Sequence, residues 1–212
     1  MDNETQESIS LPENNVDKVN PVEYSNHLKL NPKLFPLSNP ELHVLYQAGT
    51  DKTPSILGFY ITEQKDRKTT YVGHTVFNIN KPFPDTAALS INYGKTASFN
   101  RGLEDSKGIS DDIKSLAQNG SIFNALEISD GYRDKKIGGL FWTASMKLLH
   151  ERGIKKVQIE GDVTIGKIES LSSFYVNQGA EVDEKGKMEI DLEQYVIRNQ
   201  DLIAVIQKGS ES

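Results

Sequence analysis

Cysteine is absent from the 212-residue chain, and only one tryptophan and four histidines occur. The lack of cysteine excludes disulfides, zinc–thiolate sites and cysteine nucleophiles, and it is compatible with a reducing compartment. No apolar run approaches the roughly 20 residues that cross a bilayer. The polar, acidic start does not have the basic-then-apolar pattern of a secretory signal. We therefore expect a cytoplasmic protein with no membrane partner.

Positive charge is also in short supply, since 24 Lys and Arg face 30 Asp and Glu, a net charge of -6. Nucleic-acid binding needs a basic surface, so we expect no nucleic-acid partner. The histidines are His27, His43, His74 and His150. Their spacing along the chain matches no metal-ligand motif, so the sequence predicts no metal site.

The chain length fits one domain plus a tail. Residues 1–27 are rich in Asn, Glu, Asp and Ser, and we expect a disordered arm there. Residues 28–212 are then a single domain, with an insertion at about 81–120. Within this insertion ALSINY is a candidate short strand and GISDDIKSLAQNG a candidate short helix. The stretch between them, GKTASFNRGLEDSK, is predicted to be a long loop.

Several strands are predicted before the insertion. Leu42–Gln47 and Ser55–Thr62 flank AGTDKTP, which indicates a β-hairpin. A short helix begun near Ser38 and stopped by Gly49 is the alternative for the first of them. Thr70–Ile79 is rich in β-branched and aromatic residues and predicts a further strand.

After the insertion the pattern alternates between strand and helix. IFNALEI (Ile122–Ile128) predicts a strand, and apolar residues at helical spacing then predict a helix that stops at Gly153. IKKVQIEG predicts the next strand, and a second helix ends at Gly179. AEV and KMEIDL predict a last pair of strands, and EQYVIRNQDLIAVIQK is an extra helix or strand.

The turn YRDKKIGG lies between the first of these strands and its helix. Backbone N–H groups at a helix start lack intrahelical partners, and the helix dipole adds partial positive charge. Gly138 and Gly139 permit close approach of a ligand, and Arg133, Lys135 and Lys136 add formal charge. The combination is typical of a pyrophosphate site at a helix N-terminus. A solvated basic turn that only caps the helix is the alternative.

The order strand, YRDKKIGG, helix, ERGIKKVQIEGD, helix, SFYVNQGAEV resembles the GNAT superfamily of acyl-CoA N-acyltransferases. The turn of that family reads R/Q-x-x-G-x-G/A. Arg133 matches its first position, Gly138 its last, and Lys136 stands at the middle glycine. The resemblance implies an α/β (α+β) fold with a mixed, mostly antiparallel twisted sheet flanked by helices. It also implies an N-acetyltransferase that moves the acetyl group of acetyl-CoA to an amine of a small molecule or protein by direct attack.

The resemblance further implies how the acyl donor binds. The pyrophosphate would lie on the turn, and the pantetheine arm would run beside the strand before it like an added strand. A backbone N–H near Ile128 would stabilise the oxyanion of the tetrahedral intermediate. The implied cofactor-binding residues are Leu126, Ile128, Arg133, Asp134, Lys135, Lys136, Ile137, Gly138 and Gly139.

Direct attack needs a neutral amine, and therefore a base. Glu127, expected to point away from Leu126 and Ile128, and Glu160 are the candidates, with a solvated strand carboxylate as the alternative for each. Tyr175 stands where the family has its general acid. A phenol is protonated at pH 7 and can donate to the leaving thiolate; a core aromatic is the alternative for Tyr175.

Two functions of different classes stay open at this point. One is the N-acetyltransferase, with specificity for the amine set by the insertion beside the acceptor groove. The other is a catalytically inactive GNAT-like module that binds CoA or a protein partner. The sequence leaves the oligomeric state open, a homodimer included.

Overall fold

The structure is a computed structural model, and it describes residues 20–50, 53–79, 85–89, 93–107, 109–120, 126–133, 135–159 and 168–207. The strands are β1 (Val22–Lys29), β2 (Pro40–Gln47), β3 (Ser55–Lys65), β4 (Lys68–Ile79), β5 (Thr86–Leu89), β6 (Leu126–Ile128), β7 (Lys156–Ile159), β8 (Glu181–Val182) and β9 (Met188–Asp191). The helices are α1 (Tyr93–Glu104), α2 (Asp111–Gly120), α3 (Ile137–Glu151), α4 (Ile168–Asn177), α5 (Leu192–Arg198) and α6 (Gln200–Gln207), with a 3-10 turn, η1 (Asp130–Tyr132).

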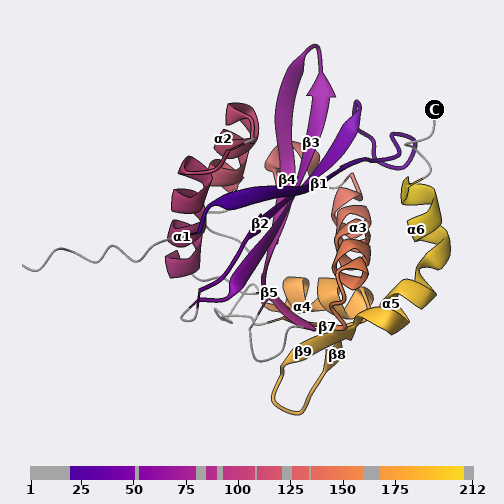
Figure 1. Ribbon diagram of the computed structural model, residues 1–212. Helices are drawn as coiled ribbons and strands as arrows, with labels where there is room; N and C mark the ends of the chain where they lie inside the picture. Colours follow the sequence, from indigo (N-terminus) through magenta and orange to yellow (C-terminus); the bar gives the residue numbers. More distant parts are fainter. Residues whose placement is uncertain are drawn as a thin grey trace, which may run out of the picture.

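All of these strands join one sheet in the order β1-β2-β3-β4-β5-β7-β9-β8, and β6 pairs with β4 beside this path. Among the described strand pairs, β5–β7 alone is parallel. Helices α1 and α2 lie on one side of the sheet, and α3, α5 and α6 lie on the other (Figure 1). The predicted mixed, mostly antiparallel sheet flanked by helices is therefore confirmed.

Strands β5 and β6 share the same edge of β4, because β3 pairs along the whole of the opposite edge. β5 lies against Asn78 and Ile79, while β6 lies against Gly73 to Thr75, and both run antiparallel to β4. β5 and β6 thus lie one after the other along the same edge of β4. The chain leaves this position after Leu89, forms α1 and α2, and returns at Leu126. Of the predicted strand 122–128, the structure describes 126–128; 122–125 lie outside the described residues.

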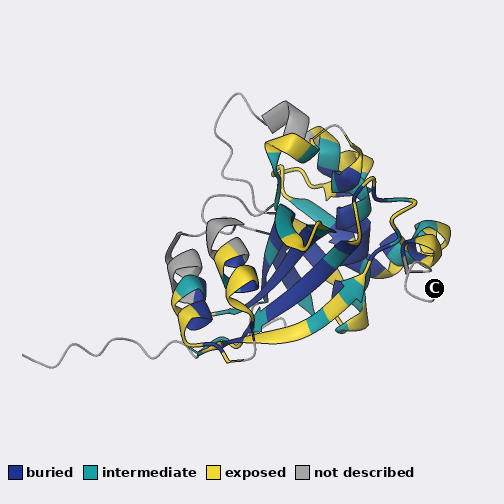
Figure 2. Cartoon of the chain, turned by 90° about the horizontal axis from the view of Figure 1, so that it is seen from above, coloured by how far each residue is buried: buried dark blue, intermediate teal, exposed yellow. Residues whose placement is uncertain are grey.

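The two sheet faces differ because successive side chains of a strand point to opposite sides. The face toward α3 carries a large apolar cluster that includes Val44, Phe59 and Phe77. The face toward α1 and α2 carries a smaller one, in which Leu45 and Tyr60 pack with Phe99 of α1. Figure 2 shows the buried strands at the centre of the molecule, with exposed surface on the outer sides of the helices.

Helix α1 replaces most of the loop that the sequence predicted for GKTASFNRGLEDSK. Its two glycines and its polar residues give little local helix signal. Phe99 and Leu103 are nevertheless buried against the sheet, so tertiary packing stabilises the helix. A Cβ on Gly102 would lie 2.6 Å from the carbonyl oxygen of Asn20. Gly102 therefore serves a close approach between α1 and the start of β1.

The ordered domain begins before the predicted boundary at residues 27 and 28, because β1 starts at Val22. Most side chains of β1 are exposed, so its sequence is polar and its composition does not indicate a strand. Backbone pairing with β2 holds it at the sheet edge. The predicted hairpin is β2–β3, so the short-helix alternative is wrong. The C-terminal segment forms two helices, α5 and α6.

The remaining predicted elements are present with small shifts in their ends. The long helix is α3, followed by Gly153 at φ 81°, and the second helix is α4, followed by Gly179 at φ 92°. No helix in the described part of the chain is long and apolar enough to cross a membrane.

Candidate functional site

The candidate site begins at β6, the short strand that leads into the basic turn. Ser129 N–H donates to the Val72 carbonyl over 2.8 Å, and Ile128 lies opposite Gly73. A Cβ on Gly73 would come within 2.5 Å of the Glu127 carbonyl oxygen, so this glycine lets β6 lie close to β4. Among the described strands β6 pairs with β4 alone, and β7 pairs with β5 and β9 instead. In the described part of the chain, no strand therefore pairs with the outer edge of β6.

Polar contacts hold the turn after β6 in place. Arg133 Nε donates to the Ile128 carbonyl over 3.2 Å, and its guanidinium lies 2.9 Å from Asp130. Tyr132 donates its hydroxyl to Glu63 of β3 over 2.7 Å, and Lys135 Nζ lies 4.9 Å from the centre of the Tyr132 ring. The turn is thus fastened to the end of β3 before the helix begins.

Lys136 is the residue immediately before α3, and its φ of 59° is in the left-handed region. This region favours glycine, which is the residue of the family turn at this position. Within the described residues, the N-cap Lys136 makes no side-chain cap at the start of α3. The N–H groups of a first helical turn have no intrahelical partner, so they can donate to a ligand. Asp134 lies outside the described residues.

A cavity of about 490 Å³ opens at this helix start. Among the described residues, its lining contains three cationic side chains and no acidic one. The lining residues are Leu34, Pro36, Lys135, Lys136, Gly139, Leu140, Thr143, Asn177, Gln178, Arg198, Asn199 and Leu202. In a protein with a net charge of -6, such a lining favours a bound anion.

Arg198 reaches this cavity from the end of α5, a segment for which the sequence gave no functional signal. A Cβ on Gly179 would come within 2.5 Å of the Arg198 guanidinium, which places the arginine over the end of α4. Tyr195 on the same helix bonds to Thr143 of α3 over 2.9 Å and to Gln178 over 3.2 Å. These contacts dock α5 beside the start of α3.

The predicted donor-binding residues divide into two groups. Ile137 is 1% exposed and belongs to the apolar core, and Leu126 and Ile128 pack against the same core. Ile137 can meet a ligand only through its backbone, whereas Leu126 and Ile128 are partly exposed. Gly138 and Gly139 have no side chain at the helix start, and a Cβ on either would meet its nearest neighbour at 3.7 Å.

Glu127 lies on the other face of the sheet, as the strand alternation predicts. It stands opposite His74 of β4, which is fully buried, and Tyr71 forms a hydrogen bond with His74 Nδ1. Burial and the charge of Glu127 raise the pKa of the Tyr71 hydroxyl well above its usual value. Glu127, Tyr71 and His74 thus form a polar cluster on the α1/α2 face. The second candidate base, Glu160, lies outside the described residues.

Tyr175 is 6% exposed and packs in the core between aromatic rings. Its ring centre lies 5.3 Å from that of Trp142 and 5.2 Å from that of Phe174. Burial raises the pKa of its hydroxyl well above the usual value, so the phenol is protonated at neutral pH. Its role as a general acid stays a prediction.

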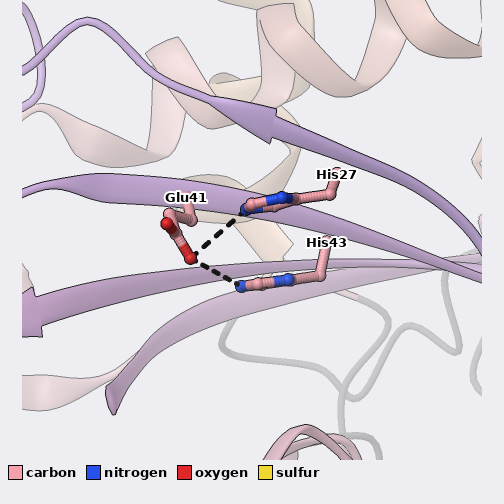
Figure 3. Close-up of side chains that lie close together, drawn as sticks. All are labelled: His27, Glu41 and His43. Carbon is pink, nitrogen blue, oxygen red and sulfur yellow. Dashed lines mark ion pairs between the residues drawn. The ribbon is translucent and has the colours of Figure 1, made fainter. Parts of the chain in front are cut away.

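Sequence spacing also missed a cluster of possible metal ligands on the α1/α2 face. His27 of β1 is the direct neighbour of His43 of β2 across the sheet, and the Glu41 carboxylate lies beside the Nε2 atoms of both imidazoles (Figure 3). The spacing of the histidines along the chain matches no metal-ligand motif, yet the fold brings His27 and His43 together. Strand pairing joins two residues 16 positions apart, and no local motif reveals such a pairing.

No family model and no curated protein matches the chain. Among solved structures, the chain is similar to a point mutant of a cAMP-binding acyltransferase from Mycobacterium smegmatis, at 10% identity and a TM-score of 0.38. The match covers 72% of this chain and 39% of the other, so the chain spans well under half the length of that protein. We base neither the fold nor the function on a likeness this weak.

Proposed function

We propose that the protein is an acyltransferase that transfers the acyl group of a CoA thioester, acetyl-CoA above all, to an amine. One observation carries the proposal. A helix start at which the N-cap Lys136 makes no side-chain cap meets three cationic side chains at a cavity of about 490 Å³, and no acidic residue lines it among the described residues. The cavity follows β6, whose outer edge pairs with no described strand. A CoA thioester needs both features, because it has a charged pyrophosphate end and a peptide-like pantetheine arm.

The backbone of β6 supports the placement of the thioester. Alternate residues of a strand direct their N–H and C=O groups to opposite neighbours. Since Ser129 N–H donates to β4, Glu127 also faces β4, and Leu126 and Ile128 face the outer edge. The Ile128 carbonyl accepts from Arg133 Nε. The Ile128 N–H is then the group that would donate to the thioester oxygen as it becomes an oxyanion.

In this proposal the amine nitrogen attacks the thioester carbonyl carbon, and Glu127 accepts the amine proton. The carbon–sulfur bond then breaks, and Tyr175 donates a proton to the departing CoA sulfur. Glu127 lies on the α1/α2 face, whereas the cavity lies at the start of α3. The acceptor amine would therefore approach from the side of α1 and α2, and the donor from the side of α3.

The burial of Tyr175 favours a second function. Its contacts with Trp142 and Phe174 are those of a core aromatic, and a chain without its general acid would bind CoA without turning it over. The second function is a CoA-binding or protein-interaction module that is catalytically inactive. Binding and turnover therefore have to be measured separately.

The binding experiment measures the melting temperature with increasing acetyl-CoA. Ligand bound only to the folded protein stabilises it, by about 2.7 kcal/mol at 100 times the Kd. We expect the native chain to show this rise, Lys136→Glu and Arg198→Glu to lose most of it, and Lys68→Glu, at the exposed start of β4, to keep it. Absence of a rise in the native chain at millimolar acetyl-CoA would contradict the acyltransferase and would leave only the protein-interaction module.

The turnover experiment measures CoA release with a panel of small amines and peptides. Glu127→Gln and Tyr175→Phe should each bind acetyl-CoA like the native chain and lose about 10²-fold or more in turnover. Unchanged turnover in Tyr175→Phe would leave this residue as a core aromatic and assign the proton to water. Binding without turnover for every acceptor would favour the inactive module.

A further inference from the structure

Three side chains with metal-ligating atoms meet on the exposed end of the α1/α2 face, away from the proposed donor cavity. His27 Nε2 lies 3.3 Å from Glu41 Oε2, and His43 Nε2 lies 3.8 Å from the same oxygen. The three ligand atoms all lie within 4.8 Å of one another. Glu41 and His43 are two residues apart on β2 and so share a face, while His27 is the direct partner of His43 on β1.

We propose that His27, Glu41 and His43 bind a divalent transition-metal ion, with zinc as the best match, and leave a fourth position open. Tetrahedral zinc with bonds of about 2.0–2.2 Å places neighbouring ligand atoms about 3.4 Å apart. The two separations between glutamate oxygen and imidazole nitrogen lie close to this value. Two imidazoles and one carboxylate suit zinc, cobalt or nickel, whereas magnesium and calcium prefer oxygen ligands alone.

Binding requires one local adjustment, which the difference in burial permits. The two imidazole rings are stacked, with centres 5.0 Å apart and planes 7° apart, so their nitrogens point side by side. They must tilt toward a common point to share an ion. His27 has a side chain that is 38% exposed and can tilt, while His43 is 5% exposed and stays fixed.

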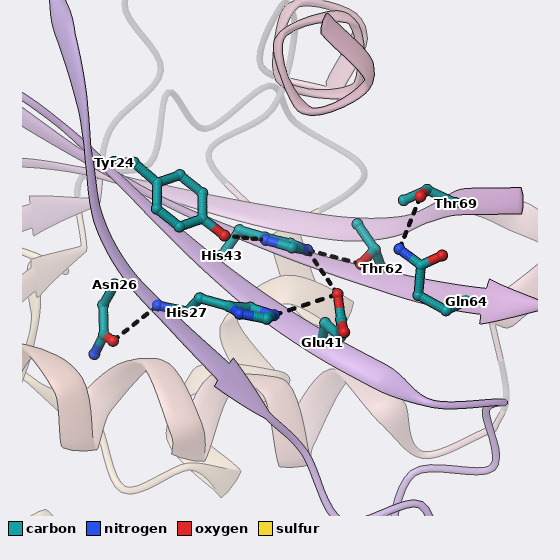
Figure 4. A network of polar contacts seen from close by, with 8 residues as sticks. All are labelled: Tyr24, Asn26, His27, Glu41, His43, Thr62, Gln64 and Thr69. Atoms are coloured by element: carbon teal, nitrogen blue, oxygen red, sulfur yellow. Dashed lines mark hydrogen bonds and ion pairs between the residues drawn. The ribbon is translucent and has the colours of Figure 1, made fainter. Parts of the chain in front are cut away.

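A second set of contacts prepares His43 as a ligand (Figure 4). The Tyr24 hydroxyl lies 2.6 Å from His43 Nδ1, on the side of the ring away from Glu41. A hydrogen bond at this nitrogen orients the ring and keeps the Nε2 lone pair available, as outer contacts do in metal sites. The Thr62 hydroxyl lies 2.9 Å from Nε2 in the free protein and turns away when the ion binds.

Space for a fourth ligand lies beside the cluster. Tyr24 and His43 also line a cavity of about 270 Å³ that extends under the start of α2, with Ser110 and Asp112 on its far side. A water or a small ligand can enter there. Three protein ligands with a fourth position beside a cavity is the arrangement of a reactive zinc site, since structural sites use four protein ligands.

The test uses the full chain without a histidine tag, stripped of metal with a chelator and titrated with Co²⁺ and then Zn²⁺. Calorimetry should give one ion per chain. The visible absorption spectrum should be that of four-coordinate Co²⁺, and added Zn²⁺ should displace the Co²⁺. His27→Ala and Glu41→Gln should each weaken binding by more than about 100-fold, beyond the loss that outer contacts cause. His150→Ala on α3 is the matched control and should bind like the native chain.

Two further measurements keep the proposal open to refutation. Circular dichroism of each variant checks that the fold is kept, which His27→Ala should allow because His27 is partly exposed. Tyr24→Phe removes only the contact to His43 Nδ1 and should weaken binding by about 10–100-fold. The proposal is overturned if the native chain binds no more tightly than a folded His27→Ala, or if Glu41→Gln and His27→Ala both bind like His150→Ala.

Discussion

The two faces of the sheet are built from the same strands and have different tasks. Toward α3, the strands present Val44, Phe59 and Phe77, all completely buried. Toward α1 and α2, adjacent positions present polar groups, among them His43 and His74, which are nearly or fully buried as well. Both faces thus hold buried side chains, but the apolar cluster is larger toward α3, and buried histidines lie on the α1/α2 face.

The buried apolar and the buried polar side chains affect stability in different ways. A buried apolar side chain stabilises the fold through the area that it removes from water. A buried polar side chain costs free energy unless it has partners, so it persists only within a hydrogen-bonded group. On the α1/α2 face such groups exist around His43 and His74. We infer that the apolar strand side chains toward α3 mainly hold the fold, and that the strand side chains toward α1 and α2 include polar groups available for function, in addition to the donor cavity at the start of α3.

The largest effect should come from breaking the apolar face. Phe59 is completely buried and packs edge-on against Phe77, with ring centres 5.8 Å apart. Phe59→Ala should lower the free energy of unfolding by about 3–5 kcal/mol, because it loses apolar burial and leaves a cavity. Urea denaturation followed by circular dichroism measures this loss. A loss below that of any single polar substitution on the other face would contradict the division between the faces.

A smaller effect is expected from the polar face. Tyr71→Phe removes the hydroxyl that bonds to His74 Nδ1 and leaves the ring in place. The buried imidazole then lacks this partner, which costs about 1–3 kcal/mol. Denaturation under the same conditions gives the comparison with Phe59→Ala. If Tyr71→Phe left the free energy of unfolding unchanged, water would have to replace the hydroxyl as the partner of His74. The cluster would then be more accessible to water than the structure indicates.

The smallest effect is expected at the rim, where Glu63 holds both the loop before β2 and the turn after β6. The Ser38 N–H, at 2.7 Å, and the Tyr132 hydroxyl lower the pKa of this carboxyl below its usual value. A lowered pKa in the folded state means that the stabilisation is present above the unfolded pKa and is lost as the pH falls through the folded one. Because Glu63 lies at the rim and is only partly buried, solvent screens these contacts and the change should stay below about 1 kcal/mol.

Stability measured between neutral and acidic pH checks this prediction. The native chain should lose slightly more stability on acidification than Glu63→Gln, whose amide does not titrate. Equal acid sensitivity of the two proteins would mean that other carboxylates dominate, and that the contacts to Ser38 and Tyr132 contribute little.

The sequence alone determined the elements whose signal is local. Short stretches of sequence specify three kinds of feature. These are the apolar periodicity of α3, the strand pattern of β2 and β3, and the glycines Gly153 and Gly179 that follow α3 and α4. The turn at Arg133–Gly139 was identified for the same reason, because strand, basic turn and helix are contiguous in the chain. Local periodicity and turn chemistry are enough to specify such features.

Tertiary structure alone decided which distant residues meet. Helix α1 forms because Phe99 and Leu103 pack against the sheet, although the local sequence favours a loop. Arg198 reaches the cavity at α3 only because α5 folds back onto that helix. His27 and His43 become neighbours through the register of β1 on β2. The physical reason is that strand register and helix docking depend on summed contacts between distant segments, and no short window of sequence contains that sum.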